Sequence, residues 1–531
     1  MKNSRYIPFI SSGILSAATV VGAATGYIDP LWTTIPLSFF GLGLYDKIQK
    51  KRSILRNYPI MGHVRYLVES IRPELRQYIV ESDNEETPFS RAQRSLVYQR
   101  AKGESDVQAF GTKVNVMKPA HEWISHSITP SKIESSDFRI IVGSERKQPY
   151  NMSVFNISAM SFGALSGNAI SALNLGAKMG NFAQDTGEGS VSPYHLEHGG
   201  DLIWELGSGY FGCRNEKGGF DPVKFEKVAS NPQIKMIEIK LSQGAKPGHG
   251  GVLPAAKITP EISLTRGIPM GVDCVSPSSH SEFSTPLELV AFIKRLRDLS
   301  GDKPVGFKFC VGHPWEFFGI CKAMIETGIF PDFIVVDGAE GGTGAAPVEF
   351  ADHVGMPLQE GLLLVHNTLV GLGIRDRIKI GASGKIVSAF DLAKVFALGA
   401  DWGNSGRGFM FTLGCIQALN CSTGNCPTGI ATQDPERQKA LVVPVKGPRV
   451  FNYHHNTMHA LQELLQATGL YHPYELKAHH IMKRVSPNEV VLLSHLLQFM
   501  EPNSLIKGEY NLPAFKTWWD KSQSSSFALK V

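Results

Sequence analysis

The stretch from Val305 to Gly344 reads VGFKFCVGHPWEFFGICKAMIETGIFPDFIVVDGAEGGTG. It opens with an apolar run, Val305–Cys310, continues through a helical pattern, Phe317–Thr327, and reaches a second apolar run, Phe333–Asp337, before a glycine-rich turn. Two short apolar runs on either side of a helix are typical of a βαβ unit, in which the strands are parallel neighbours. The stretch therefore predicts a parallel sheet covered by helices.

The same alternation extends from about Asn151 to Gln433. The runs expected as strands are Ser153–Ser158, Gly180–Thr186, Met236–Leu241, Gly271–Val275, Val305–Cys310, Phe333–Asp337, Ile378–Gly381 and Asp401–Asn404. The helical patterns that follow most of them are Leu165–Met179, Leu287–Leu299, Phe317–Thr327, Leu362–Leu372, Ala389–Leu398 and Phe411–Leu419. A longer irregular insertion is expected between the second and third strands. Eight strands over roughly 280 residues predict an α/β fold, a (β/α)8 TIM barrel, and a doubly wound sheet is the alternative.

The barrel places ligand-binding residues just after the strands, at the C-terminal rim. Polar and glycine-rich segments stand there: Met160–Gly163, Thr186–Gly189, Gln243–Gly248, Ser276–Pro277, Lys308, Asp337–Gly344, Ser383–Lys385 and Ser405–Gly408. The glycines of the last two segments indicate a phosphate site, because exposed backbone N–H groups and a helix N-terminus attract anions. Tight strand-to-helix turns are the alternative explanation. A G-x-G-x-x-G match at Gly207–Gly212 lacks the surrounding strand, turn and helix and is interpreted as chance.

Three of the seven cysteines, Cys415, Cys421 and Cys426, lie within twelve residues after the last expected strand. Thiolates at this spacing suit iron or zinc. A closed zinc site needs a fourth ligand, and no histidine lies nearby, whereas three thiolates suit an iron–sulfur cluster. The alternative is that these cysteines are small core residues, as we expect for Cys213, Cys274, Cys310 and Cys321.

The N-terminus is strongly apolar. Asp29 is the only charged residue between Tyr6 and Tyr45, and basic residues flank the segment on both sides. Ile7–Ile28 is long enough to cross a bilayer, and the shorter Pro30–Tyr45 would return. With positive charge on both outer flanks, the pattern predicts a membrane hairpin with both ends in the cytoplasm. A cleaved signal peptide and a re-entrant hairpin are the alternatives.

Composition narrows the classes of function. A net charge of +5 over 531 residues, with 19% charged and 43% apolar residues, excludes a disordered chain and does not suggest nucleic-acid binding. An odd, sparse set of cysteines indicates a reducing compartment. We expect four segments: a membrane-anchoring hairpin at 1–52, a helical lead-in at 53–149, the barrel at 150–435 and a helical extension at 436–531.

Several of these segments, in order, resemble the synthase domain of glutamate synthase, the FMN-binding half that carries out reductive amination. The similarity runs from about Ile157 to Pro435. The matching stretches are Ser158–Ser166 (SAMSFGALS), Thr186–Gly189 (TGEG), Gln243–Gly248 (QGAKPG), Gly341–Gly344 (GGTG) and Cys426–Gln433 (CPTGIATQ). The intervals of five and four residues between the cysteines are similar to the family's [3Fe-4S] ligand run. The helical lead-in and apolar N-terminus resemble a short stand-alone branch of the family.

The resemblance implies two cofactors, FMN and a [3Fe-4S] cluster on Cys415, Cys421 and Cys426. The residues expected to bind the flavin are Met160, Ser161, Gln243, Lys308, Gly341, Gly342, Thr343, Ser383, Gly384, Gly406 and Arg407. Catalysis is assigned to Glu188, which would handle ammonia and its proton, and to Lys308 and Lys246, which would hold the substrate. The implied substrates are 2-oxoglutarate and ammonia, and the implied electron donor is external, a ferredoxin or a reductase subunit.

Two other functions stay open at this point. One is an FMN oxidoreductase that acts on a different amino or hydroxy acid. The other is a membrane-tethered flavin and iron–sulfur electron carrier without a substrate of its own. A carrier has no need for a lysine and a glutamate at the barrel rim, so Lys308 and Glu188 distinguish the two classes.

Overall fold

The computed structural model describes residues 4–84, 88–510 and 512–530. The chain divides into two compact units, one up to Arg91 and one from Ala92 onward. The larger unit holds all the candidate flavin, substrate and cluster residues, and the smaller unit holds the predicted membrane hairpin.

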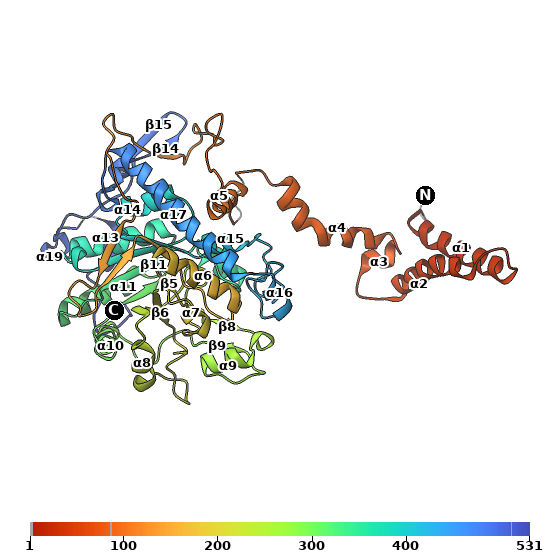
Figure 1. Cartoon of the computed structure of the whole chain (residues 1–531), viewed down its shortest axis with the longest axis horizontal. Coiled ribbons are helices and arrows are strands. Elements are labelled where there is room, and N and C mark those ends of the chain that lie inside the picture. Colours follow the sequence, from red (N-terminus) through yellow and green to blue (C-terminus); the bar gives the residue numbers. More distant parts are fainter. Residues whose placement is uncertain (1–3, 85–87, 511, 531) are drawn as a thin grey trace. The chain divides into compact units, whose positions relative to one another are not determined.

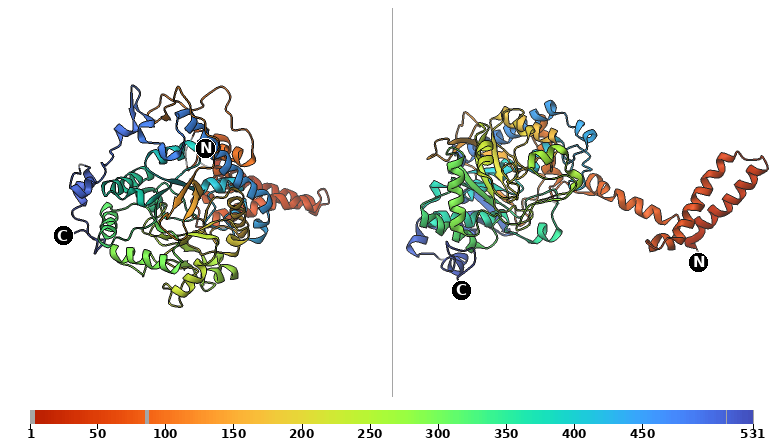
Figure 2. Two further views of the ribbon diagram at one scale, coloured as in Figure 1. Left: turned by 60° about the vertical axis from the view of Figure 1, so that its left-hand side comes forward. Right: turned by 90° about the horizontal axis from the view of Figure 1, so that it is seen from below.

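Eight parallel strands form a closed barrel at the centre of the larger unit, with helices around it (Figures 1 and 2). The strands are β4 (Phe155–Ile157), β5 (Gln184–Asp185), β6 (Leu202–Leu206), β7 (Ile234–Lys240), β10 (Val305–Phe309), β11 (Phe333–Asp337), β12 (Lys379–Ser383) and β13 (Trp402–Ser405). Each strand pairs with the next in chain order, and β13 pairs with β4 to close the ring. This confirms the (β/α)8 fold.

One member of the ring differs from the prediction. The third barrel strand is β6, inside the segment expected to be an irregular insertion, whereas Gly271–Val275 lies outside the barrel. Of that run only β9 (Cys274–Val275) is extended, paired antiparallel with β8 (Val252–Leu253). The strand was not predicted because its fourth residue, Glu205, interrupts the apolar pattern. The Gly207–Gly212 motif accordingly follows a strand directly, but the next helix begins only at Pro222.

Helices connect successive strands around the barrel. They are α6 (Gly167–Gly180), α7 (Pro193–Leu196), α8 (Pro222–Ala229), α9 (Pro260–Arg266), α10 (Pro286–Leu299), α11 (Pro314–Thr327), α12 (Val348–His353), α13 (Leu358–Gly371), α14 (Ala389–Ala397) and α15 (Arg407–Leu413). Several begin with strong caps: at α10, Thr285 and Glu288 form a reciprocal capping box and Pro286 takes the first turn. The helix expected at Phe411–Leu419 ends at Leu413, because Gly414 adopts a left-handed conformation there.

A short hairpin packs against residues from the starts of the barrel strands. Its strands are β2 (Arg139–Val142) and β3 (Tyr150–Ser153). The buried cluster formed by the hairpin and the barrel consists of Val142, Tyr150, Met152, Ala183, Ile203, Met236, Phe333, Val335 and Trp402. This packing closes the N-terminal end, so the opposite end is where loops can hold a ligand.

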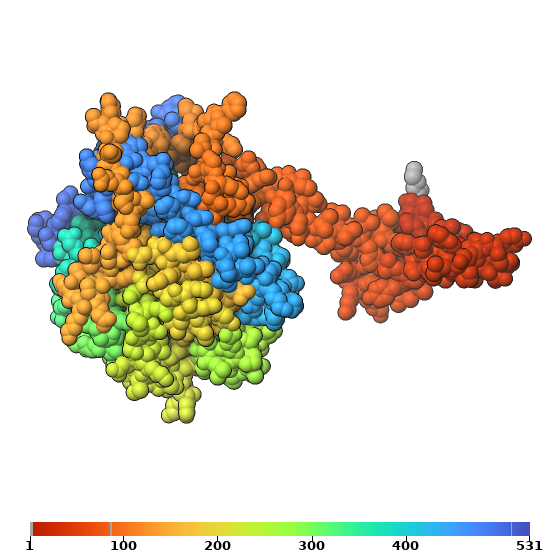
Figure 3. Space-filling model, in the orientation of Figure 1, coloured from red at the N-terminus to blue at the C-terminus, as the bar shows by residue number. Residues whose placement is uncertain are grey.

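The C-terminal region is helical, as expected, but includes strands. Helix α17 (Val443–Thr468) runs beside α6, and the two are neighbours on the surface in Figure 3. A side chain at Gly176 would lie 2.4 Å from Val450, so the helices touch through a glycine. The other elements are α16 (Pro435–Lys439), β14 (Ile481–Ser486), β15 (Glu489–Leu492), α18 (Leu493–Leu496), α19 (Ser504–Lys507) and α20 (Pro513–Trp518).

The lead-in expected to be helical to residue 149 is helical only in part. Helix α5 (Arg91–Lys102) falls where the sequence placed it, but the chain then becomes irregular and contributes β1 (Glu122–Ile124), which pairs with β14, and β2. This stretch has few apolar residues at helical spacing and is largely exposed. It therefore follows the surface instead of forming a helix of its own.

The smaller unit contains α1 (Ile7–Ala24), α2 (Thr34–Ile48), α3 (Ser53–Asn57) and α4 (Gly62–Leu75), followed by a π-helical turn, Arg76–Val80. Helices α1 and α2 pack side by side (Figure 2), with the rings of Phe9 and Phe40 stacked 5.3 Å apart. Within the described residues, Ser4–Ala24 is the one helical segment long and apolar enough to cross a membrane. Helix α2 has 15 residues, which is short for a span.

Candidate functional site

The loops after the barrel strands touch one another through glycines. A side chain at Gly187, after β5, would lie 2.7 Å from the backbone nitrogen of Ser161, after β4, and Gly187 has a φ of +62°. A side chain at Gly244, after β7, would lie 1.8 Å from the carbonyl oxygen of Gly338, after β11. Only glycine permits both approaches. The mouth of the barrel is therefore formed by backbone segments held close together.

Glu188 lies at this mouth and forms an ion pair with Lys240, whose Nζ is 3.0 Å from the Glu188 carboxylate. Lys240, at the end of β7, also donates a hydrogen bond to the Gln243 side chain, 2.8 Å away. Burial acts to raise the pKa of Glu188, but Lys240, Arg266 and Lys246 outweigh it, and the pKa falls below its ordinary value. Glu188 is therefore ionised in a setting that could accept a proton.

Two further cations lie around Glu188. Arg266, the last residue of α9, is 95% buried away from solvent and donates to the carbonyl oxygen of Phe162 at 2.9 Å. Burial lowers the pKa of Lys246, Lys240 lowers it further, and Glu188 opposes both effects. The arrangement places one carboxylate among three cations, which suits an anionic ligand that bears more than one negative charge.

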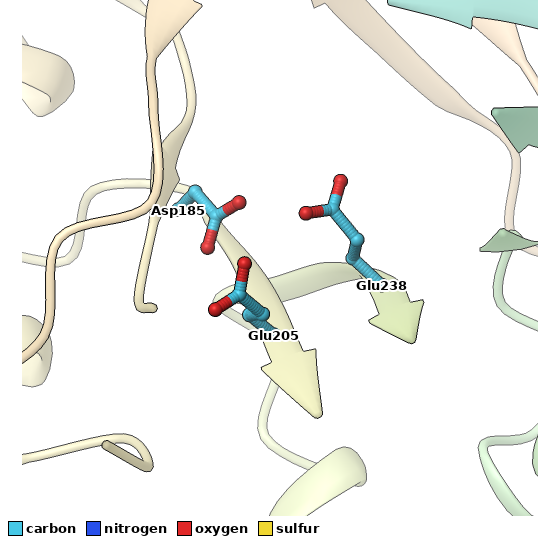
Figure 4. Close-up of side chains that lie close together, drawn as sticks. All are labelled: Asp185, Glu205 and Glu238. Atoms are coloured by element: carbon cyan, nitrogen blue, oxygen red, sulfur yellow. The ribbon is translucent and has the colours of Figure 1, made fainter. Parts of the chain in front are cut away.

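Three carboxylates point toward one another inside the barrel (Figure 4). Asp185, Glu205 and Glu238, from β5, β6 and β7, have ligand oxygens within 4.8 Å of one another, and all three residues are buried. Burial raises the pKa of Asp185, the nearby Glu205 raises it further, and Lys308 opposes the shift. Burial likewise raises the pKa of Glu238, and the neighbouring Asp185 adds to the effect.

Lys308 supplies the cation of this interior cluster. Its Nζ forms an ion pair with Glu205 and lies 3.4 Å from Glu238. Burial acts to lower the pKa of Lys308, but Glu205 and Glu238 raise it well above its ordinary value. The sequence predicts that Lys308 holds a substrate carboxylate; in the structure its ammonium group contacts Glu205 and Glu238.

The residues expected to bind the flavin lie around the mouth. The hydroxyls of Ser158 and Ser383 are 3.4 Å apart, and a side chain at Gly406 would lie 3.9 Å from the sulfur of Met160. These contacts bring the loops after β4, β12 and β13 together. Ser383, Gly384 and Gly406 therefore lie in one region with Met160.

Arg407 and the Gly341–Gly344 loop form the adjoining part. Arg407 donates to the Glu340 carbonyl oxygen at 2.7 Å, and a side chain at Gly342 would lie 2.8 Å from its guanidinium group. Burial lowers the Arg407 pKa to about 10, and Asp337 and Glu340 oppose the shift. A buried guanidinium beside small residues and hydroxyls fits a phosphate group. A side chain at Gly344 would lie 3.9 Å from the Cβ atom of Cys421, so this loop passes close to the cysteines.

The three clustered cysteines lie in the loop after α15. Burial raises the pKa of Cys415 to about 11, and the other two thiols add to the rise. At Cys426 burial also acts to raise the pKa, but hydrogen bonds from the backbone at Ala431, Thr428 and Ile430 outweigh it and lower the pKa. Donors aimed at a sulfur stabilise a thiolate at Cys426, whereas burial raises the pKa of Cys421 as it does that of Cys415. The remaining cysteines are buried, as expected: Cys213, Cys274, Cys310 and Cys321.

Sequence reasoning missed four charged residues of the site. Lys240, Glu205 and Glu238 lie within strands, where a charge reads as a break in the apolar pattern, and Arg266 ends a helix between β7 and β10. For Glu238 and Lys240 the available signal was the alternation of side chains along a strand. The two residues are two positions apart in β7 and therefore point to the same side of the strand.

Comparisons with known proteins agree with this picture. Residues 96–471 match the family described as a conserved region in glutamate synthase. The chain is 37% identical to the glutamate synthase large subunit-like protein YerD of Bacillus subtilis, over 90% of this chain and 99% of that protein. It is 35% identical to the archaeal glutamate synthase [NADPH] of Methanocaldococcus jannaschii, over 66% of this chain and 65% of that protein.

The similarity to solved structures is weaker. A flavocytochrome b2 with sulfite bound is 13% identical, with a TM-score of 0.42 over 89% of this chain and 97% of that one. The family match covers more than half of the chain and includes every rim segment described above, from Ser161 after β4 to Cys426 after β13. The chain therefore belongs to the glutamate synthase family.

Proposed function

We propose that this chain is an FMN-dependent oxidoreductase that reductively aminates a 2-oxo acid, converting 2-oxoglutarate and ammonia to L-glutamate. The observation that carries the proposal is the group of Glu188, Lys240, Lys246 and Arg266 at the barrel mouth. Three cations match the two carboxylates and the carbonyl oxygen of a 2-oxo diacid. Family membership supports the same reaction.

The reaction divides between the cofactor and the side chains. The carbonyl oxygen leaves as water, ammonia becomes the amino group, and two electrons and two protons are consumed. FMN, when bound, supplies the hydride. Glu188 accepts a proton from the incoming ammonium ion and returns one to the leaving oxygen, and its ion pair with Lys240 keeps it ionised for the first of these steps.

The flavin site is supported by the contacts around the mouth. We place the phosphate at Ser383, Gly384, Gly406 and Arg407, where the buried guanidinium and the small residues fit it. Met160 and Ser161 would support the flavin ring. Gln243, which accepts a hydrogen bond from Lys240, would contact the edge of the ring. Gly341, Gly342 and Thr343 would border it on the side of the cysteines. Lys308, paired with Glu205 and Glu238, would hold the ends of β6, β7 and β10 together at the flavin site.

Electrons would enter through a [3Fe-4S] cluster on Cys415, Cys421 and Cys426. The donors directed at Cys426 support thiolate ligation, and Lys257, which donates to the Cys421 carbonyl oxygen at 2.7 Å, adds a cation beside an anionic group. The donor is an external ferredoxin or reductase subunit. Ammonia would come from outside the chain.

The N-terminal segment would hold the enzyme at a membrane with the barrel in the cytoplasm. An 18-residue window within Ser4–Ala24 has a mean hydropathy of 1.7, and the segment is long enough to span; Lys47, Lys50 and Lys51 would stay on the cytoplasmic side. The second apolar helix would return without crossing fully, or would cross where the bilayer thins.

One experiment tests the proposal as a whole. The protein is purified in detergent, its visible and EPR spectra are recorded, and a series of 2-oxo acids is supplied with ammonia and reduced ferredoxin. We expect a flavin spectrum, an oxidised three-iron signal and amino-acid formation that is fastest with 2-oxoglutarate. A flavin that accepts electrons but reduces no 2-oxo acid would identify an electron carrier instead.

A further inference from the structure

Helix α4, with the π-helical turn that follows it, presents an apolar stripe on one face. The stripe consists of Met61, Val64, Leu67, Val68, Ile71, Leu75 and Tyr78. At roughly 100° per residue these positions fall within a sector of about 120°. All seven side chains are exposed, from 38% at Leu75 to 63% at Leu67. Folding of the smaller unit therefore leaves this face uncovered.

Arginines line one edge of the stripe. Arg65, Arg72 and Arg76 occur at intervals of seven and four residues, which places them in one row along the helix. Glu69 lies 3.7 Å from Arg65 as an exposed pair. Residues 47–80 hold eight lysines and arginines against two acidic residues, a net charge of +6, whereas the whole chain carries +5. The positive charge of the protein is thus concentrated here.

We infer that α4 lies in the plane of a membrane, with its apolar stripe in the acyl boundary and its arginine row at anionic lipid headgroups. An amphipathic helix with basic residues beside the apolar face is the form that such binding takes. The helix follows directly after the apolar α1 and α2 and the basic residues from Lys47 to Arg56, so it begins where the chain would leave the bilayer.

Charge favours lipid over a second copy of the chain as the occupant of the stripe. Two copies packed stripe to stripe would bring two cationic segments, each of net charge +6, against each other. A surface of anionic lipid neutralises them, and each basic residue near such a surface strengthens binding about fivefold. This inference rests on the proposed membrane location of the chain and not on the reaction it catalyses.

A photo-crosslinker placed in the full-length protein tests the inference. The variants Val68→p-benzoylphenylalanine, on the stripe, and Ser70→p-benzoylphenylalanine, on the opposite exposed face, are reconstituted into phosphatidylcholine vesicles with or without phosphatidylglycerol. A third variant, Leu15→p-benzoylphenylalanine in α1, reports the proposed anchor separately. Circular dichroism and flavin absorbance establish that each variant is folded. Lipid adducts and protein adducts are then counted by mass spectrometry.

We expect at least fivefold more lipid adduct from position 68 than from position 70 in vesicles that contain phosphatidylglycerol. Adding Arg65→Gln and Arg72→Gln to the Val68 variant is expected to lower its lipid adduct by tenfold or more. Equal lipid adducts from positions 68 and 70 would overturn the inference. So would adducts from position 68 to a second copy or to the barrel of the same chain. If position 15 gave no lipid adducts while position 68 did, the proposed anchor would be contradicted and the inference about α4 would stand.

Discussion

Glu188 and Lys240 form an ion pair 3.0 Å long at the mouth of the barrel, between the loop after β5 and the end of β7. Lys308, on β10, stands opposite Lys240 in the parallel register of β7 and β10, and it pairs with Glu205 and Glu238. The charged groups thus form two sets: Glu188 with Lys240 at the mouth, and Lys308 with the buried carboxylates Glu205 and Glu238. Lys240 and Lys308 are therefore expected to have different roles, and substitutions in the two sets can separate those roles.

Removing the cation of the second set, Lys308, is expected to cost stability. Lys308→Met leaves Glu205 and Glu238 buried without a counter-charge, and breaking a buried pair in this way costs about 3–5 kcal/mol of unfolding free energy. Urea denaturation monitored by fluorescence measures the loss. Lys294→Met, which breaks an exposed pair with Asp298 of 2.7 Å, is the control and is expected to cost less than about 1 kcal/mol.

A double variant tests the origin of that cost. Adding Glu205→Gln to Lys308→Met removes the stranded carboxylate, so the double variant is expected to be more stable than Lys308→Met alone. If the two losses simply add, the pair does not account for the instability, and Lys308 stabilises the barrel in some other way.

The interior carboxylates predict a pH dependence of stability. Burial raises the pKa of Asp185 to about 7 in the folded chain, from an ordinary value of 3.8. Because the folded state holds this proton more tightly than the unfolded state, stability is greatest below the unfolded pKa and is lost as pH rises from about 4 to about 7. Asp185→Asn removes the titration and keeps an oxygen for the Gly187 N–H group.

Relative to the parent chain, Asp185→Asn is expected to gain on the order of 2–4 kcal/mol between pH 5 and pH 8. Unfolding measured at both pH values supplies the comparison, and Asp352→Asn, on the exposed face of α12, is the control that should show no such gain. A variant that tracks the parent at both pH values would show that Asp185 does not carry the titration.

The contact between the loops after β4 and β5 is expected to hold the flavin site in shape. Gly187→Ala places a Cβ atom 2.7 Å from the Ser161 backbone nitrogen and moves the loops apart. Gly328→Ala has a similar φ, +66°, but meets no atom within 4 Å, so it reproduces the backbone strain without the collision. We expect the FMN dissociation constant to rise about tenfold or more in the first variant and to stay unchanged in the second. Equal FMN dissociation constants in the two variants would show that the contact at Gly187 is not needed for flavin binding.

The cysteines predict a selective loss of iron. Cys421→Ala removes a proposed cluster ligand, whereas Cys321→Ala makes the same change at a buried cysteine in α11. Iron per chain, measured together with the EPR signal, is expected to fall at least severalfold in the first variant and to remain in the second, with flavin retained in both. Equal iron contents, or zinc in place of iron, would remove the cluster from the account.

Much of the fold was predictable from the sequence, and the exceptions have physical reasons. Strands such as Phe333–Asp337 are buried on both faces and read as continuous apolar runs, so the alternation with helices revealed the barrel. β6 was missed because Glu205 faces the barrel interior, where a carboxylate is tolerated only with Lys308 beside it. That partner lies 103 residues along the chain, and no local pattern reveals it.

The site divides in the same way. Glu188 and Lys246 were predicted because they stand in loops after strands, and the structure places both near Lys240. Lys308 was assigned to the rim by its position near a strand end, but only the direction of its side chain shows that it points to Glu205 and Glu238. The position of a residue in the sequence predicts where it lies along a strand. Only its side-chain contacts show whether it faces solvent or the barrel interior.

The central claim is most directly tested by a single turnover. The protein is reduced with dithionite without oxygen and mixed with 2-oxoglutarate and ammonium, while flavin absorbance and L-glutamate are followed. The account predicts that the flavin is reoxidised, with one L-glutamate formed for each flavin, and that Glu188→Gln slows this step by about 10²–10⁴-fold with flavin still bound. Glu226→Gln, on the exposed side of α8, should behave as the parent chain. A flavin that stays reduced in the presence of both substrates, but is reoxidised by an artificial electron acceptor, would contradict the account.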